Sequence, residues 1–549
     1  MPAIIAVSRD PLMIGLEGRR RLAVPGLLVA FASLCALLLA LPGQTVVTRY
    51  LADLFIPLDA AYRVLAGQVP NRDFHTALGP LASYVPAAGY LVSGRLGAAM
   101  PVGMALVTIL LAPVIAYLLA SRLRPVIALP FGMFLVLVLV VPMNLGESVT
   151  ALSYAKFYNN IGWAALGALL VIYVRRRWQP SPFEAVADLI CATLLTLVML
   201  YTKLTFGLAA LAFLSALLFD PPQRRLAAGA LALCLLTAGL VELFWRGSSA
   251  YLGDLRQAAE VSGLVRGTAG QIFDHVLGNL ADYVLLAVFA GVSLSRTRSL
   301  ADTAFYLACA VCGFFLINQN LQAWGILTIH AAAAVAAEKY LRVSDLEPLG
   351  PERQTWSLRP GIPLLFLALV LPTIVHCTIA LGLHAAAAAT RSGQTTTFPR
   401  LAGVKLANLW TWADYDAGSS YIAALEDGAA LLSSLEPKAG PVAVLGLANP
   451  FSAGLGLDPA RGDASWLLWG RNVDAQTFLP GSQLFSDVMI LMEPKPPAEA
   501  TTSPQETGNE ALRALYRPYT SEQFKTVRTS ELWTVHRRRA VSGGVIAPR

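Results

Sequence analysis

The stretch "PVIALPFGMFLVLVLVVP", residues 125–142, contains no charged residue and is long enough to cross the apolar core of a bilayer as a helix. Similar runs recur along the 549-residue chain, of which 56% is hydrophobic and 14% is charged. Soluble proteins contain about 25% charged residues. Because the runs are continuous rather than alternating, they predict spanning helices and exclude a membrane β-barrel. The predicted fold class is an α-helical polytopic membrane protein.

Eleven segments are predicted to span the membrane. They are residues 22–42, 101–120, 125–142, 158–174, 185–201, 205–219, 226–245, 277–295, 299–317, 320–337 and 361–384. The fifth and sixth form one long apolar block that is interrupted at "YTKLT", which contains Lys203. Residues 385–549 contain no spanning segment.

Arginine clusters set the predicted orientation, because cytoplasmic loops carry an excess of basic residues. The short loops holding Arg19–Arg21, Arg175–Arg177 and Arg224–Arg225 all fall on one side of the predicted membrane. That side is assigned to the cytoplasm, together with the N-terminus. The chain is predicted to lie in a bacterial inner membrane with residues 385–549 in the periplasm. That region is neutral, so the net charge of +7 belongs to the membrane half and does not indicate nucleic-acid binding.

Two domains are expected, a membrane domain over residues 1–384 and an external domain over residues 385–549. The membrane domain has three external loops, at residues 43–100, 143–157 and 246–276. In the external domain, residues 440–447 and 487–493 read as buried strands, 421–435 as a helix and 524–538 as a hairpin. These elements predict a small mixed α/β fold, with residues 493–510 as a Pro- and Thr-rich loop.

The first external loop contains an unusual number of ionisable groups. It includes "PLDAAYRVLAGQVPNRDFHTALGPL", residues 57–81. Pro57 is expected to end the preceding segment, and Asp59 to cap a short interfacial helix that closes at Gly67. Two carboxylates with an arginine and a histidine also suit a site that binds a phosphate and moves a proton.

Residues 58–84, "LDAAYRVLAGQVPNRDFHTALGPLASY", resemble the first external loop of the GT-C superfamily of glycosyltransferases, which includes protein O-mannosyltransferases and lipid A aminoarabinose transferases. The matching residues are Asp59, Tyr62, Gly67, Asp73, Phe74, Gly79 and Pro80. Many members carry an Asp-Glu pair at the start of this motif, whereas Ala60 follows Asp59 here. The catalytic carboxylate therefore stays open between Asp59, which is preferred, and Asp73, with Asp53 not eliminated.

The resemblance implies a membrane glycosyltransferase that moves a sugar from a polyprenyl-phosphate donor to a lipid, glycan or protein acceptor. It implies inversion at the sugar, with the aspartate as general base. Candidate donor and phosphate ligands are Arg72, His75, Lys203 and Arg256, and candidate acceptor or metal ligands are Glu147, Lys156 and Asn159. A divalent ion (Mg, Mn or Ca) could assist the phosphate. Each residue also has an ordinary interpretation: Asp59 as a helix cap, Lys203 as a snorkelling side chain, and Glu147 as a solvated acid.

Three other classes of protein compete with this interpretation. A transporter or flippase would place charges or broken helices near the middle of the membrane, often with an internal repeat. Few such charges and no repeat are visible. A polysaccharide polymerase or ligase usually has its large external loop between late spans, whereas here the external region is terminal. A noncatalytic membrane scaffold is the remaining alternative.

Overall fold

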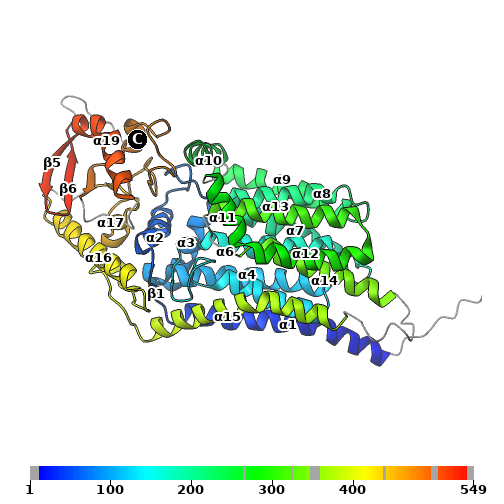
Figure 1. Cartoon of the computed structure of the whole chain (residues 1–549). Helices are drawn as coiled ribbons and strands as arrows, with labels where there is room; N and C mark the ends of the chain where they lie inside the picture. The colour runs from blue at the N-terminus through cyan, green and yellow to red at the C-terminus, as the bar shows by residue number, and fades with distance from the viewer. Residues whose placement is uncertain are drawn as a thin grey trace, which may run out of the picture.

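The computed structural model describes residues 11–263, 268–320, 322, 325–346, 359–436, 440–495 and 505–540. Each of the eleven predicted spans overlaps a helix (Figure 1), but the helix that corresponds to 320–337 begins only at Leu327 and ends at Leu346. These helices are α1 (Pro11–Ala40), α4 (Ala99–Arg122), α5 (Pro125–Val140), α6 (Phe157–Leu170), α7 (Pro182–Thr202), α8 (Leu204–Leu217), α9 (Arg224–Trp245), α12 (Leu280–Thr297), α13 (Leu300–Asn320), α14 (Leu327–Leu346) and α15 (Gly361–Ala389).

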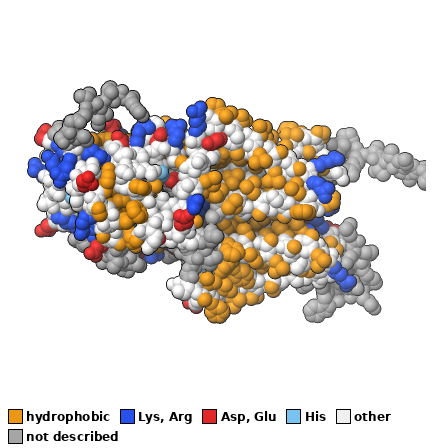
Figure 2. Space-filling view, turned by 90° about the horizontal axis from the view of Figure 1, so that it is seen from above, with side chains coloured by type: hydrophobic (Ala, Val, Ile, Leu, Met, Phe, Trp, Pro, Cys, Tyr) orange, Lys and Arg blue, Asp and Glu red, His pale blue; other side chains and the backbone are white. Residues whose placement is uncertain are grey.

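Apolar length identifies the membrane-crossing elements. Among the described residues, seven helical segments are long and apolar enough to cross a bilayer, and α5, α8 and the segment Phe157–Tyr173 are shorter apolar helices. The side of the bundle seen in Figure 2 is covered by hydrophobic side chains, with lysines and arginines at its far end. Lipid-exposed hydrophobic surface of this kind is what a spanning bundle requires. The chain is a multi-pass membrane protein.

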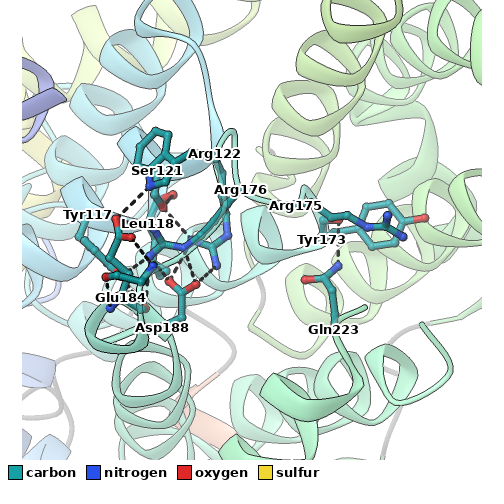
Figure 3. A network of polar contacts seen from close by, with 12 residues as sticks. Tyr117, Leu118, Ser121, Arg122, Tyr173, Arg175, Arg176, Glu184, Asp188 and Gln223 are labelled. Atoms are coloured by element: carbon teal, nitrogen blue, oxygen red, sulfur yellow. Dashed lines mark hydrogen bonds and ion pairs between the residues drawn. The ribbon is translucent and has the colours of Figure 1, made fainter. Parts of the chain in front are cut away.

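A network of charged side chains joins the end of α4 to the start of α7 (Figure 3). Asp188, near the start of α7, accepts from Arg176 Nε at 2.7 Å and pairs with Arg122 Nη2 at 2.9 Å. Glu184 pairs with Arg176 at 3.1 Å and completes a capping box with Ser181. Buried cations with hydrogen-bonded partners stabilise the packing of α4 against α7.

The C-terminal region forms a four-stranded mixed sheet with strand order β3-β4-β6-β5. Its elements are α16 (Trp412–Ser433), β3 (Val442–Val444), α17 (Pro450–Leu455), α18 (Gly481–Leu484), β4 (Ile490–Pro494), α19 (Gln505–Gln523), β5 (Phe524–Thr529) and β6 (Trp533–Arg538). The predicted helix, both strands and the hairpin are confirmed. The loop predicted over 493–510 is wrong at both ends, because β4 reaches Pro494 and α19 begins at Gln505. Residues 496–504 lie outside the described residues.

The first external loop differs from its prediction. Helix α2 runs from Leu51 to Leu65 with Pro57 inside it, so Pro57 does not end a segment and Asp59 does not cap a helix. A proline at this position removes one helical hydrogen bond. Burial of Leu54, Phe55 and Leu58 against the core offsets that loss. The following apolar stretch forms α3 (Leu81–Ser93), and the third loop contains α10 (Ser248–Ser262) and α11 (Ala269–Gly278).

A short parallel strand pair joins the first loop to the segment after the last span. Strand β1 (Thr45–Val47) pairs with β2 (Val404–Leu406), and Thr45 also donates to the carbonyl of Gly97 at 2.8 Å. A Cβ atom on Gly97 would lie 2.5 Å from the Cα of Gly403, so the two backbones can approach only because both residues lack a side chain. The first loop and the segment after the last span therefore form one connected structure.

Candidate functional site

A carboxylate lies at the start of α2, in the part of the first loop nearest the bundle. Asp53 is in the first turn of this helix and is partly exposed. Burial raises the pKa of Asp53 to about 6, and the nearby Lys156 opposes this shift. A carboxyl group with this pKa is mostly ionised at neutral pH and is still basic enough to accept a proton.

The second external loop brings a lysine to this carboxylate. The Lys156 backbone is held by its N–H, which donates to Asn144 Oδ1 at 3.1 Å, just before α6 begins at Phe157. Burial lowers the pKa of Lys156, while the carboxylates of Glu147 and Asp53 oppose that shift. Lys156 and Asp53 are therefore near enough for each to shift the pKa of the other.

Lys203 approaches the same place from the junction of α7 and α8. Its Nζ donates to Asn159 Oδ1 at 3.2 Å and lies 5.0 Å from the ring centroid of Tyr158. The loop backbone at Gly79 fixes this junction, because its N–H donates to the Thr202 carbonyl at 3.1 Å. Burial lowers the pKa of Lys203 well below its ordinary value, and Arg471 and Lys156 lower it further.

The C-terminal region contributes a third cation. Arg471 follows Gly470, a glycine with φ of +71°, and its Nη1 atom is buried with no hydrogen-bond partner among the described residues. Burial lowers the pKa of Arg471, and Tyr158 opposes the shift. Helix α10 supports the same turn, because Gln257 Nε2 donates to the Asn472 carbonyl at 2.8 Å. Figure 1 shows α10 at the junction of the bundle and the C-terminal region.

Lys156, Lys203 and Arg471, here called the cation cluster, repel one another through their charges. All three side chains are partly exposed, as is Asp53 beside them. Gathering like charges in a partly buried place is unfavourable, and a bound anion would offset the repulsion. An ammonium pair with a guanidinium fork suits a phosphate group, and Asp53 supplies a proton acceptor next to it.

Glu147 lies at the edge of this site rather than in its centre. Its carboxylate accepts from Asn144 Nδ2 at 3.1 Å and pairs with Arg49 Nη1 at 3.7 Å. Arg49 also pairs with Asp414 of α16 at 3.3 Å. This chain of charges connects the first loop, the second loop and the C-terminal region beside Asp53.

Asp59, the preferred catalytic residue from the sequence, lies elsewhere. Its carboxylate is fully buried and accepts from Arg63 Nε at 2.6 Å. The same guanidinium donates to both oxygens of Asp463, at 2.5 and 2.9 Å. Burial raises the pKa of Asp59 to about 6 and also raises that of Asp463, although Arg63 opposes both shifts. These three residues, here called the buried triad, attach α2 to the C-terminal region.

The remaining first-loop candidates make contacts within the loop and with α10. Asp73 accepts from the Val69 N–H at 2.8 Å and pairs with Arg72 at 3.4 Å, whose side chain is 43% exposed. His75 Nδ1 lies 2.7 Å from Asp254 Oδ1 on α10.

In the third loop, Arg256 has an 82% exposed side chain and pairs with Glu260 on the same helix. The structure therefore brings Lys203, Lys156 and Asn159 together with Glu147 at their edge. It does not bring Asp59, Asp73, Arg72, His75 or Arg256 to the cation cluster.

The residues around Asp53 do not fit a divalent metal ion. Within the described ranges, no group of three or more His, Cys, Asp or Glu side chains is arranged to hold one. Glu147 is engaged by Arg49 and Asn144, and Lys156 lies next to Asp53. Divalent ions prefer several oxygen ligands, and this site presents cations instead.

Two important residues were not found from the sequence. Arg471 lies in "WGRNVD", which has no motif that separates it from an ordinary turn. Arg63 lies four residues after Asp59, and that spacing on a helix predicts contact between them. The spacing was therefore a usable signal for the buried triad, whereas the position of Arg471 depends on the folding of the whole C-terminal region.

Comparisons with known protein families and with curated proteins find no match for this sequence. Among solved structures, the chain is similar to ArnT from Cupriavidus metallidurans in two states. The apo structure aligns with a TM-score of 0.47 and 14% identity over 94% of this chain and 98% of ArnT. The structure bound to undecaprenyl phosphate aligns with the same TM-score and identity over 96% and 100%.

Proposed function

We propose that the chain is a membrane glycosyltransferase that takes a sugar from a polyprenyl-phosphate donor. The observation that carries this proposal is the cation cluster beside Asp53, at the junction of the spanning bundle and the C-terminal region. A lipid-linked phosphate reaches such a place from the side, with its chain in the membrane and its head group at the interface. The resemblance of residues 58–84 to GT-C glycosyltransferases supports the same donor class.

In the proposed reaction, an acceptor hydroxyl or amine attacks the anomeric carbon of the sugar. The new bond forms as the bond from that carbon to the phosphate oxygen breaks, which inverts the configuration. Asp53 takes the proton from the acceptor. Lys203, Lys156 and Arg471 stabilise the negative charge on the departing polyprenyl phosphate. We assign the base to Asp53 rather than Asp59 because Asp59 is buried and paired with Arg63.

Supporting residues position these groups. Asn159 orients the Lys203 ammonium, and Asn144 holds the backbone of Lys156. Glu147 pairs with Arg49 at the edge of the site. We assign this edge to the acceptor. Arg72, Asp73, His75 and Arg256 are assigned to the surrounding surface and not to the donor phosphate.

Replacing Lys203 by glutamine tests the phosphate site. Losing a charge-assisted hydrogen bond costs about 1.5–3 kcal/mol, so the KM for the donor is expected to rise by about 10- to 100-fold. The assay follows sugar transfer from a panel of radiolabelled polyprenyl-phosphate sugars to envelope glycans and lipids, using purified protein in nanodiscs.

The matched control is Arg256→Gln, which removes an exposed cation from the same face and should change KM by about twofold or less. An equal effect of the two variants would place the phosphate elsewhere. If folded wild-type protein neither transfers nor hydrolyses any donor of the panel, the proposed function is wrong.

The pH dependence of transfer is expected to follow Asp53. Only the ionised carboxylate accepts a proton, so the rate is expected to be full above the Asp53 pKa of about 6 and to fall as the pH drops through it. Because the pKa of Asp59 is also about 6, the Asp59→Asn variant is the control and should keep this acid limb. If the fall of the transfer rate at acid pH is absent in Asp59→Asn, the base is Asp59.

A further inference from the structure

A second cavity lies within the spanning bundle, away from Asp53. It has a volume of about 830 Å³, which lies in the range of small-molecule and lipid sites. It opens between α8 and α13, with side chains of α6 and α14 also lining it. Its walls are mostly apolar and include Leu170, Phe213, Leu217, Phe305 and Cys309.

Small side chains explain why this cavity is open. Ala209, Ala212 and Ala216 of α8 line it, and Ala301, Ala304 and Ala308 of α13 face them. In both helices the spacing of three and four residues places these alanines on one face. Facing alanines in membrane helices usually allow close packing, but here Ala212, Ala216, Ala304 and Ala308 remain exposed. The two helices thus leave an apolar slot that is open to lipid.

One end of the slot carries charges. Lys339 of α14 pairs with Asp302 of α13, and its Nζ lies 4.3 Å from the ring centroid of Tyr173. Tyr173 donates its hydroxyl to Asp302 at 2.7 Å. Next to them, Arg175 pairs with Asp220 at 3.3 Å while its side chain stays 63% exposed. Figure 3 shows Arg175 beside Tyr173 and Gln223 at this end of the bundle.

The charged rim is rich in cations and contains a hydroxyl group without a partner in the described part of the chain. Lys339, Arg175 and Arg342 line it with the carboxylates of Asp302 and Asp220, and Arg342 also pairs with Glu338 at 2.8 Å. Thr297 also lines it, and its Oγ1 atom is buried with no hydrogen-bond partner among the described residues. A basic rim at the end of an apolar slot between spanning helices matches an anionic lipid head group and its acyl chains.

This rim and the cation cluster lie at opposite ends of α8. The helix begins beside Lys203 and ends at Leu217, just before Asp220. Its length is about 20 Å at 1.5 Å per residue. A head group at Arg175 therefore belongs to the leaflet on the far side from the C-terminal sheet, which is the predicted cytoplasmic leaflet.

We propose that the slot between α8 and α13 binds an anionic phospholipid of that leaflet. Its acyl chains fill the alanine-lined slot, and its phosphate accepts from Arg175, Lys339 and the Thr297 hydroxyl. The bound lipid fills the space between α8 and α13 and so supports the helix that presents Lys203. This site does not depend on the glycosyltransferase proposal.

The test measures the lipid retained by the full-length protein. Protein is purified from vesicles containing equal amounts of phosphatidylglycerol and phosphatidylcholine, washed in mild detergent, and analysed for bound lipid by mass spectrometry. The Ala304→Phe variant fills the slot, and Arg175→Glu reverses the charge of an exposed rim residue without touching the core. Both are expected to lower retained phosphatidylglycerol by about tenfold, the equivalent of about 1.4 kcal/mol.

The matched control is Ala232→Phe, which adds the same ring to an exposed alanine of α9 outside the slot and should retain lipid like the wild type. Thermal unfolding in detergent checks that each variant is folded. If Ala304→Phe does not fold, Arg175→Glu alone decides. Equal phosphatidylglycerol retention in wild type and Arg175→Glu would overturn the proposal, as would equal retention of phosphatidylglycerol and phosphatidylcholine by the wild type.

Discussion

The Asp53→Asn variant is expected to lose sugar transfer by about 10²- to 10⁴-fold in kcat/KM, the usual contribution of a general base. The amide has the same shape as the carboxylate but cannot accept the proton of the acceptor. Burial raises the pKa of Asp53 to about 6, which means that the negative charge is unfavourable at this position. The neutral amide removes that charge. The variant should therefore be at least as stable to heat as the wild type while being nearly inactive.

The Asp59→Asn variant separates this interpretation from the one suggested by the sequence. Asp59 contacts Arg63 inside the buried triad and has no exposed surface. Its replacement leaves the Arg63 guanidinium paired with Asp463 and is expected to leave most of the transfer activity of each folded molecule. Donor binding, measured with a non-transferable donor analogue, should remain intact in Asp53→Asn. Full transfer by folded Asp53→Asn would exclude Asp53 as the base.

Replacing Arg63 by methionine is expected to destabilise the protein by about 3–5 kcal/mol, because removing one partner of a buried ion pair leaves charge without compensation. Here two carboxylates, Asp59 and Asp463, would face each other without the guanidinium that bridges them. Methionine fills much of the same volume, so the loss reflects charge more than a cavity. Thermal and denaturant unfolding in detergent measure the change.

Two further variants make this prediction specific. Arg72→Met removes an exposed arginine from the same loop and is expected to cost about 0–1 kcal/mol, as surface ion pairs do. Combining Arg63→Met with Asp59→Asn and Asp463→Asn removes the repelling charges and should recover part of the lost stability. If Arg63→Met and Arg72→Met unfold alike, the buried triad does not hold α2 to the C-terminal region.

The spanning architecture could be predicted from the sequence because it depends on local composition. An uninterrupted apolar run such as residues 125–142 has few alternatives to a helix in a bilayer, and the corresponding helix ends within two residues of the prediction. The strands at 440–447 and 487–493 were equally local signals. Helix α19 was missed because its start, "QETG", shares the polar composition of the loop before it.

The site was predictable only in part. Lys203, Lys156 and Asn159 were found because polar residues beside spanning segments are unusual. Asp59 was preferred over Asp53 because of the resemblance to GT-C enzymes, in which an aspartate opens the juxtamembrane helix. The packing of Leu54, Phe55 and Leu58 instead lets α2 begin at Leu51, so Asp59 lies inside the helix. Arg471 lies far along the chain from Lys156 and Lys203, and no local pattern could reveal that it would come near them.

The joining of β1 to β2 and of Arg63 to Asp463 also sets the order in which the protein matures. Translation delivers the spanning helices and Asp53 long before residues 404–406, Asp463 and Arg471 are made. Until then Arg63 lacks its second carboxylate and the cation cluster lacks its guanidinium. If the proposed function is right, a nascent chain that stops after the last span lacks a complete donor site. Donor binding would then begin only after the last part of the chain has been made and has folded.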